Sequence, residues 1–142
     1  MKRSHAFTVI ELIFVIVVLG ILASVALPKF AGVREQADIA KGKGDVATIR
    51  AAIANNRQKN VVLGSGGSYI TAANLDTGGL FGGVLITPMT PSSTSGHWDN
   101  NGANGNGSYR YWVGSTSTQF DYNATTGSFG CTSGTYCNQL TN

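Results

Sequence analysis

The chain has 142 residues, of which 42% are hydrophobic and 12% charged, and its formal net charge is +3 at pH 7. This length allows one small globular domain beside an N-terminal apolar segment. Beyond the adjacent Lys2 and Arg3, the Lys and Arg residues from Lys29 to Lys59 are spread singly and are interleaved with acidic residues. This pattern favours the solvated face of a helix over a basic binding stripe, so no nucleic-acid partner is indicated.

The first predicted element is an apolar helix. Between Phe7 and Leu27 every residue is apolar, small or hydroxyl-bearing except Glu11. As a helix this segment would be about 31 Å long, close to the hydrocarbon thickness of a bilayer. The insertion free energy of its many Leu, Ile, Val and Phe residues outweighs the roughly 3 kcal/mol cost of one acidic side chain. The segment can therefore span a membrane, and Glu11 needs a separate explanation.

Two ordinary alternatives exist for this segment. A secretory signal peptide would be cut near Ser24-Val25-Ala26, but the apolar run is longer than usual and helical spacing continues past that point. A plain membrane anchor would leave Glu11 unexplained.

The helical pattern continues to about Asn56, so we predict one long helix from about Phe7. Its first half is apolar on all sides and its second half is amphipathic. We expect a kink at Pro28 and weak points at Gly32, Gly42 and Gly44. At Pro28 and Gly32 two interpretations stay open, a static bend and a place where the helix melts locally. The residues predicted to face a domain are Ile39, Val46, Ile49 and Ile53.

From Val61 onward the composition changes to Gly, Ser, Thr and Asn, with short apolar runs that predict antiparallel strands. The best hairpin candidate joins residues 119–122 to residues 128–131. Further strands are predicted at residues 84–86 and 109–113, and an exposed loop at residues 97–108. We therefore expect an α+β fold in which the long helix packs on a small antiparallel sheet.

The C-terminal region contains both cysteines, Cys131 and Cys137. A disulfide closing a short loop is the natural interpretation if this region lies outside the cytoplasm. Zinc is the weaker alternative, because the only histidines are His5 and His97.

No catalytic site is predicted. The triplet Asp76-Thr77-Gly78 matches that of aspartic proteases, but it occurs once and is ordinary turn chemistry. A serine triad lacks a plausible histidine partner, since only His97 lies outside the first six residues.

The residues Ser-His-Ala-Phe-Thr-Val-Ile-Glu-Leu, followed by the apolar run and Pro28, resemble the class III prepilin leader of type IV pilins and type II secretion pseudopilins. The resemblance implies a leader at residues 1–6, a transmembrane and polymerisation helix at residues 7–28, and a periplasmic or extracellular domain at residues 29–142. Prepilin peptidase would cut between Ala6 and Phe7, and Phe7 would be N-methylated. Ala6 departs from the family, which nearly always has glycine there.

In this family Glu11 matches the acidic residue that acts in assembly. Subunits insert into the inner membrane with a cytoplasmic N-terminus and then polymerise, helped by a platform protein and an ATPase. The resemblance thus implies a non-enzymatic subunit of a surface pilus, used in adhesion, motility or DNA uptake. The alternatives are a major pseudopilin in a periplasmic pseudopilus, and a monomeric anchored binding domain that uses an exposed Trp98.

No cofactor is expected, with one alternative. Some major pseudopilins hold calcium in a C-terminal loop, and oxygen ligands occur together in one loop here. They match no defined calcium-loop spacing, and surface solubility is the favoured explanation. These residues are Asp99, Asn101, Asn104 and Asn106.

Overall fold

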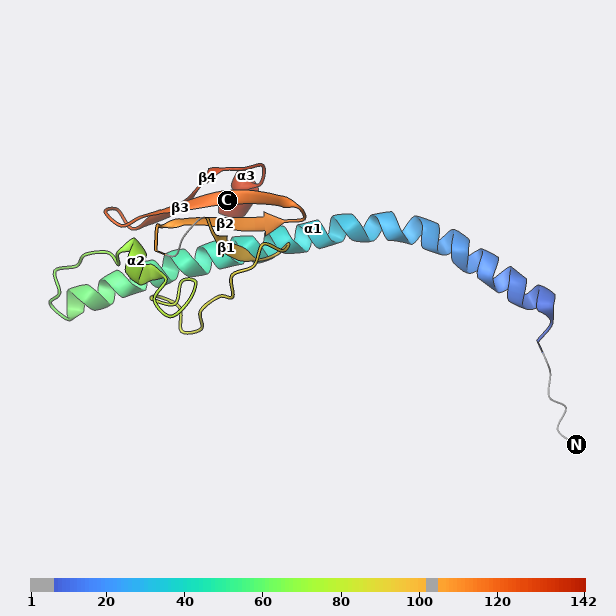
Figure 1. Cartoon of the computed structure of the whole chain (residues 1–142), viewed down its shortest axis with the longest axis horizontal. Coiled ribbons are helices and arrows are strands. Elements are labelled where there is room, and N and C mark those ends of the chain that lie inside the picture. Colours follow the sequence, from blue (N-terminus) through green and yellow to red (C-terminus); the bar gives the residue numbers. More distant parts are fainter. Residues whose placement is uncertain (1–6, 102–104) are drawn as a thin grey trace, which may run out of the picture. The chain divides into compact units, whose positions relative to one another are not determined.

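The computed structural model describes residues 7–101 and 105–142, with backbone alone at residues 27–29 and 31 (Figure 1). Two compact units are distinguished, Met1–Arg34 and Glu35–Asn142. The elements in chain order are α1 (Val9–Val62), α2 (Ala72–Leu75), β1 (Trp98–Asn100), β2 (Ser108–Val113), β3 (Thr116–Asn123), β4 (Ser128–Ser133) and α3 (Cys137–Thr141). The predicted α+β class is confirmed.

Helix α1 runs from Val9 to Val62, so the prediction of one helix that includes Pro28 is confirmed, whereas its end was placed too early at Asn56. The helix is closed by Gly64, whose φ is +73°. The Gly64 N–H donates to Val61 O at 3.1 Å and the Ser65 N–H to Asn60 O at 2.9 Å. This is the hydrogen-bond pattern of a Schellman cap, for which glycine is favoured. The expected kink at Pro28 stays a prediction.

The sheet has four antiparallel strands in the order β1-β2-β3-β4. Burial alternates along β2 and β3, as expected for a sheet with one face on a core. The predicted hairpin is confirmed as β3–β4, and Asn123 Oδ1 accepts hydrogen bonds from the N–H groups of Thr125 and Thr126 in its turn. The strand expected at residues 84–86 was wrong: the chain makes turns there, and Ile86 is exposed.

The exposed loop expected at residues 97–108 was partly wrong as well. Residues Trp98–Asn100 form edge strand β1, paired with β2, and Trp98 is only 2% exposed. Its Nε1–H donates to Asp45 Oδ2 at 3.1 Å. The Asn- and Gly-rich composition that predicted a loop applies to the residues after β1. A binding surface centred on an exposed Trp98 is therefore excluded.

The core lies between the second half of α1 and one face of the sheet (Figure 1). The predicted helix stripe is confirmed, because all four of its residues are buried: Ile39, Val46, Ile49 and Ile53. Opposite them lies an aromatic cluster in which the ring centroids of Phe81 and Tyr109 are 4.5 Å apart and those of Trp98 and Tyr111 are 4.9 Å apart. Aromatic side chains thus supply most of the apolar surface that covers the helix.

Gly42 lies on the same helix stripe and lets the sheet approach closely. A Cβ atom there would overlap the Tyr111 ring and lie 2.7 Å from Leu140 Cδ2. Tyr111 also donates its hydroxyl to Asp38 O at 2.6 Å, which holds the ring against the helix. The sequence identified Gly42 only as a weak point in a helix, but here it is required for packing.

Candidate functional site at the N-terminal helix

The start of α1 is organised by Thr8. Its Oγ1 accepts the Glu11 N–H at 3.3 Å, and its carbonyl oxygen accepts the Leu12 N–H at 3.2 Å. Thr8 is thus the N-cap, and Glu11 occupies the third helical position, as in the Thr-x-x-Glu capping box. A carboxylate in the first turn also interacts favourably with the helix dipole. The charge of Glu11 therefore has a local electrostatic role at the helix start that the sequence analysis did not consider.

The apolar half of α1 presents its side chains to its surroundings. Phe7 is 81% exposed and Ile10 75%, and every residue from Phe7 to Ala26 is classed as exposed. The segment Val9–Ala26, with mean hydropathy 2.9, is long and apolar enough to cross a membrane. Burial of one large apolar side chain contributes about 1.5–3 kcal/mol, so lipid or other helices must cover this surface.

Several predicted site residues fall in or beside this segment. Ala6 lies outside the described residues, so the geometry of the predicted cleavage site is not defined. Pro28 is inside α1, and a Cβ at Gly32 would meet nothing within 4 Å. Gly32 is therefore not required for packing within the subunit, and its predicted role in helix bending stays a prediction.

The predicted disulfide is present between Cys131 and Cys137, whose Cα atoms are 5.5 Å apart. It joins β4 to α3, and α3 contributes the buried Leu140 to the core beside Gly42. The Tyr136 hydroxyl, in the same loop, donates to Glu35 Oε1 at 3.0 Å. The disulfide loop thus holds the C-terminus against the domain part of α1.

The residues proposed for calcium are engaged in other contacts. Asp99 Oδ1 accepts from Arg110 Nε at 2.9 Å, and Asp99 Oδ2 from Arg110 Nη2 and Trp112 Nε1, each at 3.0 Å. Asn106 donates to Asn101 O, and Asn104 lies outside the described residues. Among residues 7–101 and 105–142, no three His, Cys, Asp or Glu side chains cluster. Calcium binding stays the less favoured alternative, and it would have to displace Arg110 from Asp99.

The Asp76 carboxylate, part of the protease-like triplet, accepts hydrogen bonds from several separate segments of the domain. This structural role was not predicted from the sequence. The carboxylate accepts hydrogen bonds from Phe81 N at 3.1 Å, from Gly105 N at 3.1 Å, from the Tyr109 hydroxyl at 3.2 Å and from Asn100 Nδ2 at 3.3 Å. Burial and this carboxylate both raise the pKa of Tyr109. Asp76 also holds the bulky Phe81 at a φ of +57°, a strained conformation.

Replacing Asp76 by alanine should lower the free energy of unfolding by about 3 kcal/mol, because several part-buried donors would lose their acceptor. Thermal unfolding of the full chain in detergent, followed by the near-UV circular dichroism of Trp98 and Trp112, measures this. The control is Thr77→Ala, which changes an exposed neighbour and should stay within about 0.5 kcal/mol. Equal melting temperatures for the two variants would contradict the role assigned to Asp76.

Comparison with known proteins agrees with this geometry at the N-terminus. The prokaryotic N-terminal methylation motif matches residues 1–27. These residues are a prepilin-type N-terminus. Within this motif lie Ala6, Phe7 and Glu11, the residues predicted for processing and assembly.

Two curated relatives extend the similarity. The chain is 39% identical over 51 residues to the Type II secretion system core protein G of Pectobacterium carotovorum, covering 36% of this chain and 33% of that protein. It is 42% identical over 52 residues to the Type IV narrow pilus major component PilA5 of Thermus thermophilus, covering 37% of this chain and 45% of that protein. The matched segments thus span less than half of either relative. They carry no information about the rest of this chain. No solved structure matches.

Proposed function

We propose that this chain is a structural subunit that polymerises through its prepilin-type N-terminal helix into a type IV pilus-like filament. The observation that carries the proposal is the exposed apolar helix with one carboxylate, Glu11, four residues from Phe7. In lipid or in a filament core this surface is covered, whereas a monomer outside the membrane would expose it to water.

Cleavage before Phe7 would create a new amino group at the head of the apolar helix. That group is cationic at neutral pH, and the Glu11 carboxylate of a neighbouring copy can pair with it. In a medium of low dielectric such a pair is strongly coupled, and either charge alone is heavily penalised. The pair would therefore set the axial register of adjacent copies rather than add much net stability.

A capping role of the Glu11 side chain would not account for its charge. A glutamine at the third helical position completes a capping box as a glutamate does. Apart from its interaction with the helix dipole, worth about 0.3–1 kcal/mol, the charge needs a cationic partner, and the leader-processed terminus would supply one. This difference makes the two roles of Glu11 separable by one substitution.

A periplasmic pseudopilus of type II secretion is the second candidate. It is favoured by the relatives found, most of which are core protein G from several bacteria. The disulfide and the polar Thr- and Asn-rich domain favour a surface pilus. Both candidates share the same subunit chemistry: inner-membrane insertion, leader removal by prepilin peptidase, and assembly by a platform protein and an ATPase, without catalysis by the subunit itself.

Electron microscopy of material sheared from cells tests the proposal. We expect thin filaments that an antibody against residues 35–142 labels along their length, and their loss when the chain is deleted. A pseudopilus would instead remain in the periplasm of wild-type cells. Recovery of the chain solely as a monomer in the membrane fraction would contradict both filament proposals.

A further inference from the structure

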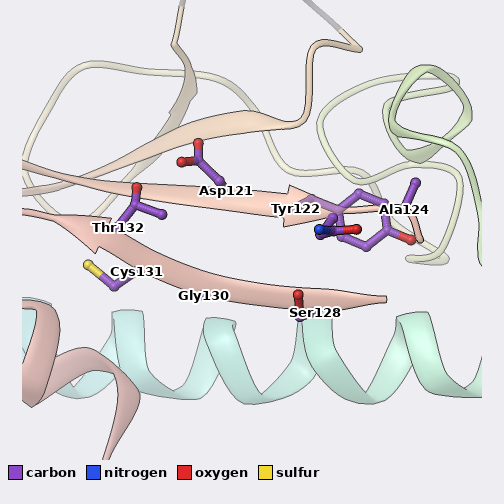
Figure 2. A pocket seen from close by; sticks show the side chains of 8 residues that line it. Asp121, Tyr122, Ala124, Ser128, Gly130, Cys131 and Thr132 are labelled. Carbon is purple, nitrogen blue, oxygen red and sulfur yellow. The ribbon is translucent and has the colours of Figure 1, made fainter. Parts of the chain in front are cut away.

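The face of the sheet opposite α1 contains a hollow of about 560 Å³ over the β3–β4 pair. Figure 2 shows Asp121 and Thr132 pointing away from α1 on this side. Phe120 and Tyr122, which alternate with Asp121 along β3, are buried in the core between the sheet and α1. The hollow is therefore separated by the sheet from the helix of its own subunit.

Gly130 forms the floor of the hollow and is not required by the fold. It lies in β4 opposite Asp121, its φ is outside the left-handed region, and a Cβ atom there would meet nothing within 4 Å. Glycine inside a strand weakens the strand, and it often marks a place where another group approaches closely. The absent side chain leaves room directly beside the Asp121 carboxylate.

The Asp121 carboxylate is held in place and charged. Its Oδ1 accepts from Ser108 Oγ at 2.8 Å and from Gln119 Nε2 at 3.4 Å. Partial burial raises the pKa of Asp121, but hydrogen bonds from Ser108, Thr132 and Gln119 outweigh it and leave the pKa below its usual range. Among the described residues, Arg110 and Asp99 form the one ion pair, so Asp121 has no cationic partner in its own subunit.

The remaining polar side chains around the hollow are neutral: the Asn123 amide, whose Oδ1 accepts the N–H groups of Thr125 and Thr126, and the hydroxyls of Ser128 and Thr132. A carboxylate surrounded by neutral oxygens suits an ammonium group, which donates three hydrogen bonds and carries a compact charge. A carboxylate or phosphate ligand would be repelled by Asp121. The charge of the hollow thus favours a cationic group, and an exposed lysine side chain supplies one.

We propose that this hollow receives the Lys59 ammonium group of a second copy of the chain. Beyond Asp45, α1 carries Arg50, Arg57 and Lys59 and no acidic residue. Arg50 donates to Phe129 O, and Arg57 donates to Gly67 O and lies over the Tyr69 ring. Lys59 is exposed in the last turn of α1 and forms no ion pair within the described part of the chain.

Charge complementarity between copies therefore joins the basic end of one α1 to the outer sheet face of the next. The α1 helix of the same subunit covers the opposite face of the sheet, so the pair forms between subunits. This inference rests on the proposed filament, in which copies of the domain lie side by side.

Carbodiimide treatment of sheared wild-type filaments tests the pair, since it couples a carboxylate to a lysine amine only when they touch. In filaments mixed from ¹⁴N and ¹⁵N subunits, we expect mass spectrometry to find an isopeptide bond between Asp121 of one isotope and Lys59 of the other. The matched control is Lys43, a second exposed lysine on α1. Coupling of Asp121 to Lys43 alone, to another protein or to nothing would overturn the inference.

Variants give a second measurement. Gly130→Val places a side chain in the hollow at a position where a Cβ atom meets nothing within 4 Å, so it should keep the melting temperature. It should nevertheless lower the filament yield about fivefold, as should Lys59→Glu. Lys43→Glu should change the yield less than about twofold. The double variant Asp121→Lys with Lys59→Asp should restore the wild-type yield. Normal filament yields from both Gly130→Val and Lys59→Glu would refute this pair and leave the filament proposal intact. The absence of filaments from the wild-type chain would refute the filament proposal itself.

Discussion

Replacing Glu11 by glutamine should leave leader removal and membrane insertion at wild-type levels and abolish filaments. The backbone N–H of residue 11 still donates to Thr8 Oγ1, and glutamine suits the third helical position as glutamate does, so the helix start is preserved. The substitution removes the negative charge of Glu11. The Phe7 amine of the neighbouring copy would then lie unpaired in a medium of low dielectric. Removing one partner of a buried pair costs about 3 kcal/mol or more at each subunit contact, which corresponds to more than about a hundredfold in each contact's equilibrium constant.

The measurement is the amount of sheared filament together with the proportion of processed chain in the membrane. Glu11→Ala should behave like Glu11→Gln, because both remove the charge. Thr8→Ala is the control, since it removes the cap and keeps Glu11, and it should reduce filaments only slightly. If Thr8→Ala and Glu11→Ala lost filaments while Glu11→Gln kept them, capping would explain Glu11 and the intermolecular pair would be wrong.

Gly42→Ala should lower the free energy of unfolding of the domain by about 2–3 kcal/mol, despite the higher helix propensity of alanine. The added methyl group would overlap Tyr111 and Leu140, and the Tyr111 ring is tied to Asp38 O. The sheet would have to shift away from α1. Thermal unfolding followed by the near-UV signal of the buried Trp98 reports this directly.

The matched control lies two residues further along the same helix. A Cβ at Gly44 would meet nothing within 4 Å, so Gly44→Ala should raise stability by about 0.5–1 kcal/mol. Opposite signs for the two glycines are the signature of close packing at Gly42. Stabilisation by both substitutions would mean that the sheet does not approach α1 as described.

The elements with strong periodicity could be predicted from the sequence. Ile39, Val46, Ile49 and Ile53 repeat at helical spacing, and all four are buried. The β3–β4 hairpin was predictable because alternation in Phe120 and Tyr122 precedes turn residues that end at Gly127, whose φ is +71°. The N-terminal site was predictable because a single carboxylate in an apolar run is a local feature of the sequence.

The sequence-based predictions that were wrong concerned segments whose structure depends on contacts between residues distant in the sequence. Trp98–Asn100 is too short for a strand pattern, and it is a strand because it pairs with Tyr109–Tyr111. Residues 84–86 looked like a strand, but they follow the turn in which Asp76 holds Phe81. Gly42 looked like a defect in a helix because nothing local shows that Tyr111 packs against it. The end of α1 was readable from Gly64, but the loss of apolar spacing after Asn56 hid it.

The most direct test of the filament account is the mass of the subunit recovered from sheared filaments. We expect a chain that begins at Phe7, carries one N-terminal methyl group and retains the Cys131–Cys137 disulfide. A chain beginning at Leu27 would show that the apolar segment is a removed signal peptide and would contradict assembly through the N-terminal helix. Filaments built from subunits that still begin at Met1 would equally contradict the account, because the Phe7 amine that pairs with Glu11 would not exist.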